Sequence, residues 1–389
     1  MNSFESTPAD MAQVIQDFLP AYRQRYRLTP DQASVCQSIV QCQTEDLGGE
    51  YSQCTVCGYE QRLYHSCGNR HCPRCKQKAS EQWEDKQLEA LLPVRYYHLV
   101  FTLPHEFNAW CQLHPSEIYS LFFKALWQTL SLFSKTHKRL RGQLGVSCVL
   151  HTLGQNLQRH VHIHCLIPGV ALKEGHDAIE STQSDYLYPV NALKKVFRGK
   201  MVSLLRNAYQ QGELFRITQD NEVSKVLDEV MRKKWSIYIK PYLENPETVV
   251  KYLSRYTYRI AIGNDRIIKT DGQNVYFHWK DYADNNRKKI MKLEGVEFLR
   301  RFLMHVLPSG FMRIRHFGFL ANCVRRKRVT LLRQLLKVAD SLSSTVTQIM
   351  KPREPEKPAC LCPSCHQGNM RSLYQIPSVK KRRQQQLLA

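Results

Sequence analysis

Three histidines occupy alternate positions in the segment LQRHVHIHCLIPG, residues 157–169. One apolar residue separates each neighbouring pair, so the segment has the two-residue period of a β-strand, and His160, His162 and His164 share one face. Neutral imidazole is a common ligand of divalent metals, and burying two imidazoles without partners is costly. We therefore expect His162 and His164 to bind a divalent cation, whereas His160 by itself fits an ordinary surface or core position.

A second β-rich run, GVSCVLHTL at residues 145–153, precedes the histidines across a short polar stretch. Two such runs predict an antiparallel hairpin. If position 151 lies opposite position 162, His151 joins the same face and becomes a third imidazole ligand. A rigid sheet would hold these ligands in place better than a loop.

Two tyrosines lie four residues apart in the segment NPETVVKYLSRYTYR, residues 245–259. The Asn-Pro-Glu start predicts a helix, on which Tyr252 and Tyr256 share one face at about 5–6 Å between their Cβ atoms. Tyrosine on an amphipathic helix usually packs in the core. Beside a metal site, however, the pair could supply the nucleophile of a transfer reaction.

Cysteines dominate the segment CTVCGYEQRLYHSCGNRHCPRCKQ, which begins at residue 54. Two Cys-x-x-Cys pairs separated by fourteen residues resemble the ligand spacing of a zinc ribbon. We expect one tetrahedral Zn²⁺ site with four thiolate ligands: Cys54, Cys57, Cys72 and Cys75. Buried free thiols are the alternative. Four further residues lie close enough in sequence to replace a ligand or to form a second site: Cys42, His65, Cys67 and His71.

The overall composition suggests a polyanionic partner. The 389 residues include 56 Lys and Arg against 34 Asp and Glu, a net charge of +22, and in a globular protein such an excess most often serves nucleic acid. A solvated basic surface without a specific partner is the alternative. We expect DNA contacts from four arginines near the two motifs: Arg70, Arg74, Arg255 and Arg259.

The length predicts two or three domains, with a hydrophobic content of 43% that is typical of a globular protein. No apolar stretch approaches the roughly 18 residues of a membrane span, and the first residues do not resemble a signal peptide. We therefore expect a cytoplasmic protein without membrane contacts, in which paired cysteines bind metal and do not form disulfides.

The elements that must position these motifs follow from the local pattern. Threonine-proline pairs at residues 7–8 and 29–30 predict two helix starts ahead of the cysteines. The other expected elements are a strand at 95–104, an apolar helix at 115–135, a β-meander from about 259 to 282 that extends or flanks the sheet of the histidines, and a helix at 296–308.

Taken together, these motifs resemble a known family. His162-Ile163-His164 is similar to the HUH motif (His, hydrophobic, His), and Tyr252-x3-Tyr256 is similar to the paired tyrosines of HUH single-strand endonucleases. The segments LHTLGQNLQRHVHIHCLIPG, YLSRYTYRIAI and FLMHVLPSGFMRIRHFGFLAN resemble the two-tyrosine transposases of rolling-circle insertion sequences, the IS91-like family. The similarity covers nearly all of residues 30–325 in the order of the family.

The resemblance implies a definite chemistry. In such enzymes the histidine pair binds Mg²⁺ or Mn²⁺, which polarises the scissile phosphate of single-stranded DNA. A tyrosine attacks phosphorus and forms a 5′-phosphotyrosine link with release of a 3′-hydroxyl. The resemblance implies that Tyr252 and Tyr256 alternate in this role. It also implies a third metal ligand, for which His151, Gln155 and His160 compete; the hairpin register favours His151. Val161 stands where many relatives have proline.

The C-terminal region has a different composition. The segment KPREPEKPACLCPSCHQGNM, which begins at residue 351, is a proline-rich linker that leads into cysteines. Cys360, Cys362 and Cys365 could form part of a small zinc knuckle with His366, although half-sites of this kind are often unoccupied. The last residues, SVKKRRQQQLLA, predict a basic arm.

We thus expect an α+β protein in which a small helical and zinc-ribbon-like domain (residues 1–90) precedes an HUH nuclease with a central antiparallel sheet and flanking helices (94–340) and a linker with tail (345–389). It would bind single-stranded and double-stranded DNA at the insertion-sequence ends and the target, at the bacterial nucleoid. Two alternatives remain: a plasmid-type replication initiator or relaxase with the same chemistry, and a zinc-dependent DNA-binding regulator without catalysis.

Overall fold

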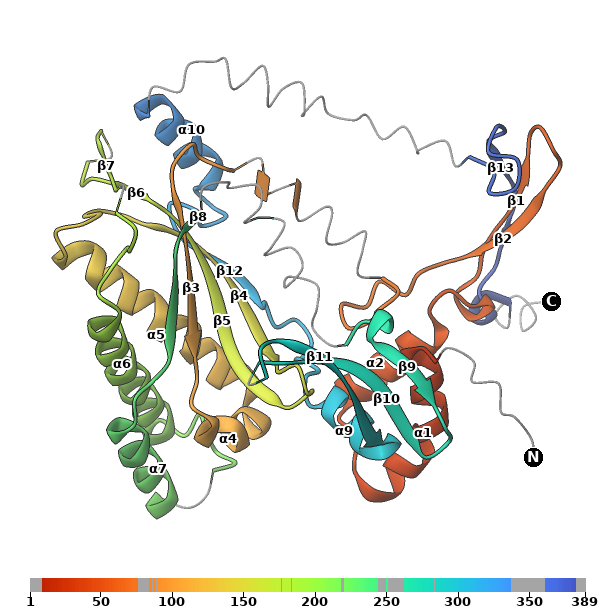
Figure 1. The fold of residues 1–389 in the computed structure, drawn as a ribbon, viewed down its shortest axis with the longest axis horizontal. Coiled ribbons are helices and arrows are strands. Elements are labelled where there is room, and N and C mark those ends of the chain that lie inside the picture. The colour runs from red at the N-terminus through yellow and green to blue at the C-terminus, as the bar shows by residue number, and fades with distance from the viewer. Residues whose placement is uncertain are drawn as a thin grey trace.

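A computed structural model describes the chain over residues 9–75, 84–85, 87–88, 90–175, 177–182, 184–217, 220–243, 250, 262–282, 284–336 and 361–382. These residues form a mixed α+β structure with a large sheet, a smaller meander sheet and a third, small sheet at one end (Figure 1). No helix within the described ranges combines the length and the apolar character needed to cross a membrane.

The central sheet has five antiparallel strands in the order β12-β4-β5-β3-β8. Its strands are β3 (Tyr96–Thr102), β4 (Gly145–Leu153), β5 (Arg159–Pro168), β8 (Ile237–Leu243) and β12 (Ile314–Gly318). The predicted hairpin of β4 and β5 is therefore at the middle of the sheet, where both strands have neighbours on each side.

Helices cover the face of this sheet opposite the histidines. Alternation along β5 places Ile163 and Cys165 on that face, where they belong to the main hydrophobic core. Phe101 of β3 packs edge-on against Phe197, with 5.0 Å between the ring centroids. The helices around this core are α4 (Asn108–Leu113), α5 (Pro115–Thr136), α6 (Val190–Gln210) and α7 (Asp220–Arg232) (Figure 1).

A second core joins the N-terminal helices to the meander. Helices α1 (Met11–Arg25), α2 (Pro30–Gln41) and α9 (Gly295–Leu303) pack with strands β9 (Ile267–Thr270), β10 (Asn274–Asp281) and β11 (Arg287–Glu294). Thr29 and Gln32 form a capping box at the predicted start of α2. Asp10 caps the start of α1, because its side chain accepts a hydrogen bond from the Gln13 N–H. The helix therefore begins at Met11, later than the Thr7-Pro8 pair at which the sequence predicted a helix start.

Of the two arrangements expected for the meander, the structure excludes extension of the central sheet. Strands β9, β10 and β11 form a separate three-stranded sheet. Its inner face carries Val275 and Phe277, both buried, and Phe277 packs against Phe298 of α9 at 5.4 Å between ring centroids. The apolar face of the meander is thus used against the helices.

The third sheet combines residues from both ends of the described chain. Strands β1 (Gly49–Cys54), β2 (Glu60–Tyr64) and β13 (Met370–Ile376) lie in the order β13-β1-β2, apart from the two larger units (Figure 1). Shorter elements complete the fold: β6 (Val170–Leu172), β7 (Ile179–Ser181), α10 (Arg325–Leu335) and the 3-10 helices η1 (Glu45–Leu47), η2 (His105–Phe107) and η3 (Asn264–Arg266).

Candidate functional site

The strand pairing brings three histidines together on one face of the central sheet. His151 of β4 lies directly opposite His162 of β5, and His164 follows on the same face opposite Val149. One ring nitrogen of each imidazole lies within 4.8 Å of the others. The pairing of position 151 with position 162, which the sequence favoured and which makes His151 the candidate third ligand, is therefore the register of the structure.

Hydrogen bonds to Nδ1 orient two of these rings. The Nδ1 of His162 lies 2.7 Å from the His160 carbonyl oxygen and donates to it, because the carbonyl can only accept. The Nδ1 of His164 lies 3.0 Å from the Nε2 of His98 on β3, and their rings are stacked. The carbonyl contact leaves the lone pair of His162 on Nε2, where it can coordinate a cation. His164 reaches the same state when its Nδ1 donates to His98, since a ligating histidine commonly fixes its tautomer through the other nitrogen.

Burial keeps the imidazoles of His162 and His164 neutral at physiological pH. Burial lowers the pKa of His162 to about 4 and that of His164 well below its ordinary value, and neighbouring imidazoles lower the latter further. Lys240, which pairs with His98 across β3 and β8, contributes to the lowered pKa of His164. Neutral imidazole presents a lone pair, so these shifts suit metal coordination.

The other two candidates for the third ligand lie outside the convergent group. The His160 ring is 4.9 Å from that of His162 between centroids, but its nitrogens do not join the close set. The Gln155 side chain lies in the turn of the hairpin and donates to the Tyr282 hydroxyl at 3.4 Å. His162 is only half-buried, whereas His151 and His164 are buried, so His162 is the most accessible of the three rings.

The predicted nucleophiles Tyr252 and Tyr256 lie outside the described residues, as do Arg255 and Arg259. Val250, two positions before Tyr252 in the sequence, is described and is buried. It packs in a small cluster with Tyr96 and Leu166. Leu166 follows His164 by two positions on β5, so Val250 packs on the histidine face of the sheet.

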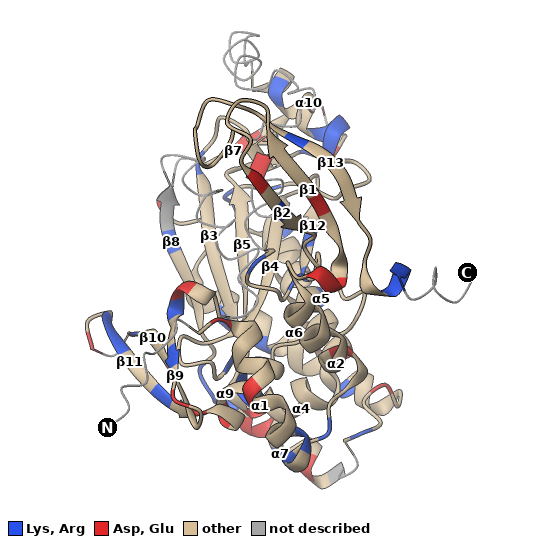
Figure 2. Cartoon of the chain, turned by 90° about the vertical axis from the view of Figure 1, so that its right-hand side faces the viewer, with Lys and Arg blue, Asp and Glu red and all other residues tan. Residues whose placement is uncertain are grey.

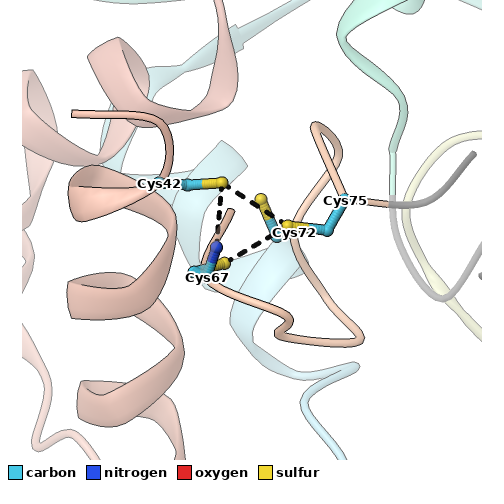
Figure 3. Close-up of side chains that lie close together, drawn as sticks. All are labelled: Cys42, Cys67, Cys72 and Cys75. Atoms are coloured by element: carbon cyan, nitrogen blue, oxygen red, sulfur yellow. Dashed lines mark hydrogen bonds between the residues drawn. The ribbon is translucent and has the colours of Figure 1, made fainter. Parts of the chain in front are cut away.

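The first cysteine group surrounds the end of α2. Cys42, Cys67, Cys72 and Cys75 place their sulfur atoms within 4.8 Å of one another (Figure 3). The Cys75 sulfur is 3.5 Å from that of Cys42 and 3.6 Å from that of Cys67. Backbone N–H groups of Cys67 and Asn69 point at the Cys42 and Cys67 sulfurs. Four thiolates with such donors form a good structural Zn²⁺ site.

The second cysteine group corrects the predicted ligand set. Cys54 and Cys57 do not meet Cys72 and Cys75; their sulfurs converge instead with those of two distant residues, Cys362 and Cys365. The sulfur atoms lie 3.7 Å apart between Cys54 and Cys365 and 3.6 Å apart between Cys57 and Cys362.

Strand pairing explains this arrangement. β13 runs antiparallel to β1 from Gly49 opposite Ile376 to Cys54 opposite Met370, which carries the C-terminal cysteines to the N-terminal hairpin. The sequence signal was a shared pattern, Cys-x-x-Cys followed closely by glycine, at both places. His366 is exposed and outside the group, and Cys360 lies outside the described residues.

Two arginines expected to contact DNA have partners within the chain. The Arg70 guanidinium donates to the Phe311 and Pro308 carbonyls, both at 2.6 Å. The Arg74 guanidinium donates to the Cys42 carbonyl at 2.5 Å and forms an ion pair with Asp10. Both side chains therefore fasten the first cysteine group to its surroundings.

Comparisons with known proteins agree with this organisation. A family described as "Putative transposase" matches residues 145–328, which include the histidine hairpin, and a family described as "Transposase zinc-binding domain" matches residues 14–103, which include the first cysteine group. No solved structure matches the chain significantly.

Two curated relatives extend over most of the chain. A protein of Sinorhizobium fredii named "Putative transposase y4qJ" is 34% identical over 93% of this chain and 94% of its own length. The transposase for insertion sequence element IS801 of Pseudomonas savastanoi pv. phaseolicola is 27% identical over 77% of this chain and 73% of its own length. The chain belongs to the IS91-like family of insertion-sequence transposases, with a zinc-binding domain ahead of its transposase region.

Proposed function

We propose that the protein is a rolling-circle transposase, which cleaves and rejoins single-stranded DNA through 5′-phosphotyrosine intermediates. The observation that carries the proposal is the convergence of His151, His162 and His164 on one sheet face. Three imidazoles on rigid, fully paired strands fit a divalent cation better than they fit an ordinary core. The enzyme would act in the cytoplasm, on the DNA ends of its element and on the target.

The three imidazoles would hold the catalytic cation through one ring nitrogen each. When bound, Mg²⁺ or Mn²⁺ polarises the scissile phosphate and offsets the charge that develops on it. His98 and the His160 carbonyl keep the rings of His164 and His162 in the coordinating orientation. An all-nitrogen donor set suits Mn²⁺ better than Mg²⁺, which prefers oxygen ligands. We therefore expect Mn²⁺ to support the reaction at lower concentrations than Mg²⁺.

Tyr252 and Tyr256 would supply the nucleophile, as in the two-tyrosine relatives. The phenol, with an ordinary pKa near 10, must lose its proton before or during attack. Its oxygen bonds to phosphorus, the bond from phosphorus to the 3′ oxygen breaks, and the 3′ oxygen takes up a proton to leave as a hydroxyl. Val250 supports this assignment, because it lies on the histidine face of the sheet and only two positions before Tyr252.

The two cysteine groups would each hold one structural Zn²⁺. The first, on α2 and the loop that follows β2, would fix the N-terminal helices around the second core. The second would join the β1–β2 hairpin to β13 and so fasten the C-terminal segment to the N-terminal domain. Both groups have four thiolates and several N–H donors directed at sulfur, as a closed structural site requires.

A covalent-adduct assay tests the proposed function. The zinc-loaded protein is mixed with end-labelled single-stranded DNA from the flanks of its own gene and Mn²⁺ or Mg²⁺, and run on a denaturing gel. Variants Tyr252→Phe, Tyr256→Phe and the double variant are run beside it, together with His162→Ala. Tyr258→Phe is the matched control, because Tyr258 is not part of the predicted tyrosine pair.

The expected result is a metal-dependent covalent band that survives either single tyrosine change at least in part. It disappears in the double tyrosine variant and in His162→Ala. Persistent DNA binding without any adduct, on all flanking sequences and with both metals, would overturn the proposal and favour a DNA-binding regulator.

A further inference from the structure

On the outer face of the meander sheet, lysine side chains lie beside aromatic rings. Strand alternation directs Val275 and Phe277 toward the helices and leaves the intervening positions in contact with solvent. Figure 2 shows Lys and Arg along β11 and at parts of β9 and β10. We define the outer face by five residues that share this side: Lys269, Tyr276, Lys280, Lys288 and Lys292.

Tyr276 lies at the centre of one cross-strand row. Lys269 of β9 and Lys292 of β11 are its two neighbours in register, and their Nζ atoms lie 5.3 and 5.7 Å from the ring centroid. The Tyr276 hydroxyl donates to a carboxylate oxygen of Asp271 at 2.9 Å, which holds the ring in position. The row therefore combines an oriented aromatic ring with two cations.

A second row repeats the combination. Lys280 lies opposite Lys288, and the Lys280 Nζ is 5.7 Å from the centroid of the Tyr282 ring. Tyr282 is 64% exposed, which leaves it accessible to a ligand. Ile290, 61% exposed, lies between the two rows opposite the exposed His278.

Asp271 accepts the Tyr276 hydroxyl, and no carboxylate of the meander forms an ion pair with these lysines within the described residues. Asp281 and Asp284 form ion pairs with Lys289, at 2.9 and 2.8 Å. Lys289 lies opposite Trp279 in the strand register and so belongs to the inner side of the sheet, not to the outer face. Glu294, at the end of β11, pairs with Arg25 of α1. Among the ion pairs of the described residues, none involves the four lysines of the outer face.

The meander is also joined to the turn of the histidine hairpin. Besides the contact of Tyr282 with the Gln155 side chain, the Arg266 guanidinium donates to the Gln155 carbonyl at 2.6 Å and to the His278 carbonyl at 2.8 Å. Gln155 lies between His151 and His160 in the sequence. A strand bound on the outer face thus lies beside the end of the hairpin from which the histidines project.

We propose that the outer face of the meander binds single-stranded DNA and delivers it to the histidine site. The proposal rests on the proposed function, because it assigns the path of that substrate. Lysines are point charges that follow a phosphate backbone, and exposed aromatic rings on a sheet stack with unpaired bases. A duplex would present its bases only in the grooves, where a flat row of tyrosine and isoleucine has little to contact.

Fluorescence anisotropy with a labelled 20-nucleotide single strand tests the proposal over a range of salt concentrations. A variant of the outer face, called the platform variant, carries four changes: Lys269→Gln, Lys280→Gln, Lys288→Gln and Lys292→Gln. The matched control removes the same charge from four exposed lysines of the helices on the other side of the central sheet: Lys124→Gln, Lys135→Gln, Lys195→Gln and Lys225→Gln. A third variant, Tyr276→Ala with Tyr282→Ala, removes the rings alone.

The platform variant should bind the single strand at least tenfold more weakly than the control variant. Its log–log salt slope should become shallower by about 3, since each single-strand phosphate contact contributes about 0.7. The tyrosine variant should lose affinity with little change in slope. Equal affinity of the platform and control variants, or a loss confined to duplex DNA, would overturn the proposal. Because all four lysines are exposed, unchanged melting temperatures should verify folding.

The adduct assay separates this proposal from the proposed function. At saturating DNA, the platform variant should still form the metal-dependent covalent product, whereas His162→Ala should bind DNA and form none. If the wild-type protein forms no adduct but loses affinity through the platform changes, the binding surface stands and the proposed chemistry fails. If adduct forms while the platform variant binds normally, the chemistry stands and the binding surface is elsewhere.

Discussion

Removing two cysteines near the C-terminus should release zinc from a site whose other two ligands lie in the N-terminal region. The double variant Cys362→Ser, Cys365→Ser leaves Cys54 and Cys57 as two thiolates where four are needed. Structural zinc is held by about 10–16 kcal/mol in four-ligand sites, and two ligands cannot supply that stability. The wild-type protein should therefore contain two zinc ions per chain and the double variant one, because the group at Cys42, Cys67, Cys72 and Cys75 remains intact.

Metal content measured by mass spectrometry after gel filtration gives the count directly. The reciprocal variant Cys54→Ser, Cys57→Ser should lose the same single ion. Cys323→Ser is the matched control, because Cys323 is exposed and belongs to neither group, and it should retain both ions. The ion that remains in each double variant also verifies that the N-terminal domain has folded.

Limited proteolysis adds a second readout, since loss of the ion should expose β13, which pairs with β1 beside it. Retention of both ions by the Cys362→Ser, Cys365→Ser variant would refute the reasoning. One ion per chain in both the wild-type protein and this variant would instead favour the single site that sequence spacing suggested, with the ligands Cys54, Cys57, Cys72 and Cys75.

Three further predictions concern the histidines and Arg70. His98→Ala should weaken Mn²⁺ binding, measured by calorimetry, by about 10- to 100-fold, because His164 loses the partner of its Nδ1, while the zinc content stays unchanged. His305 is buried between the Thr152 hydroxyl and the Leu157 carbonyl, and burial lowers its pKa to about 3. The folded state thus resists protonation of His305, so the contribution of the neutral ring to stability is complete above pH 6.5 and declines as the pH falls toward 3. His305→Gln should therefore flatten the fall of the melting temperature between pH 6.5 and 3. An unchanged slope in this variant would contradict the prediction. Arg70→Ala should lower the free energy of unfolding in urea by about 3 kcal/mol, because several carbonyls lose a charged donor, and should leave the salt slope of DNA binding unchanged. A shallower slope would restore Arg70 as a phosphate contact.

Local patterns were sufficient where the interacting residues are close in sequence. The alternation around His162 and His164 predicts a strand, and its short separation from His151 leaves few hairpin registers, so the third imidazole could be placed before the fold was known. The capping box of Thr29 and Gln32 was also predictable, because its four residues carry all of its hydrogen bonds.

Other features were beyond local reasoning, because their partners come from distant parts of the chain. The zinc-ribbon spacing gave the presence of a metal-binding domain but the wrong grouping of ligands, since Cys54 and Cys365 are 311 positions apart and meet only through the pairing of β1 with β13. Arg70 and Arg74 were expected to contact DNA from their charge, and only the packed structure shows the carbonyls and Asp10 that they bind. His98 was missed entirely, because its role depends on a neighbouring strand.

The sequence by itself determined the family, the strand of histidines, the presence of cysteine metal groups and the basic character of the protein. Each of these depends on residue type and short spacing. The tertiary structure decided which cysteines share an ion, which imidazole orients His164 and where the meander presents its lysines. These features depend on strand pairing and on the face that each sheet buries, which are set by the packing of the whole chain and cannot be read from neighbouring residues.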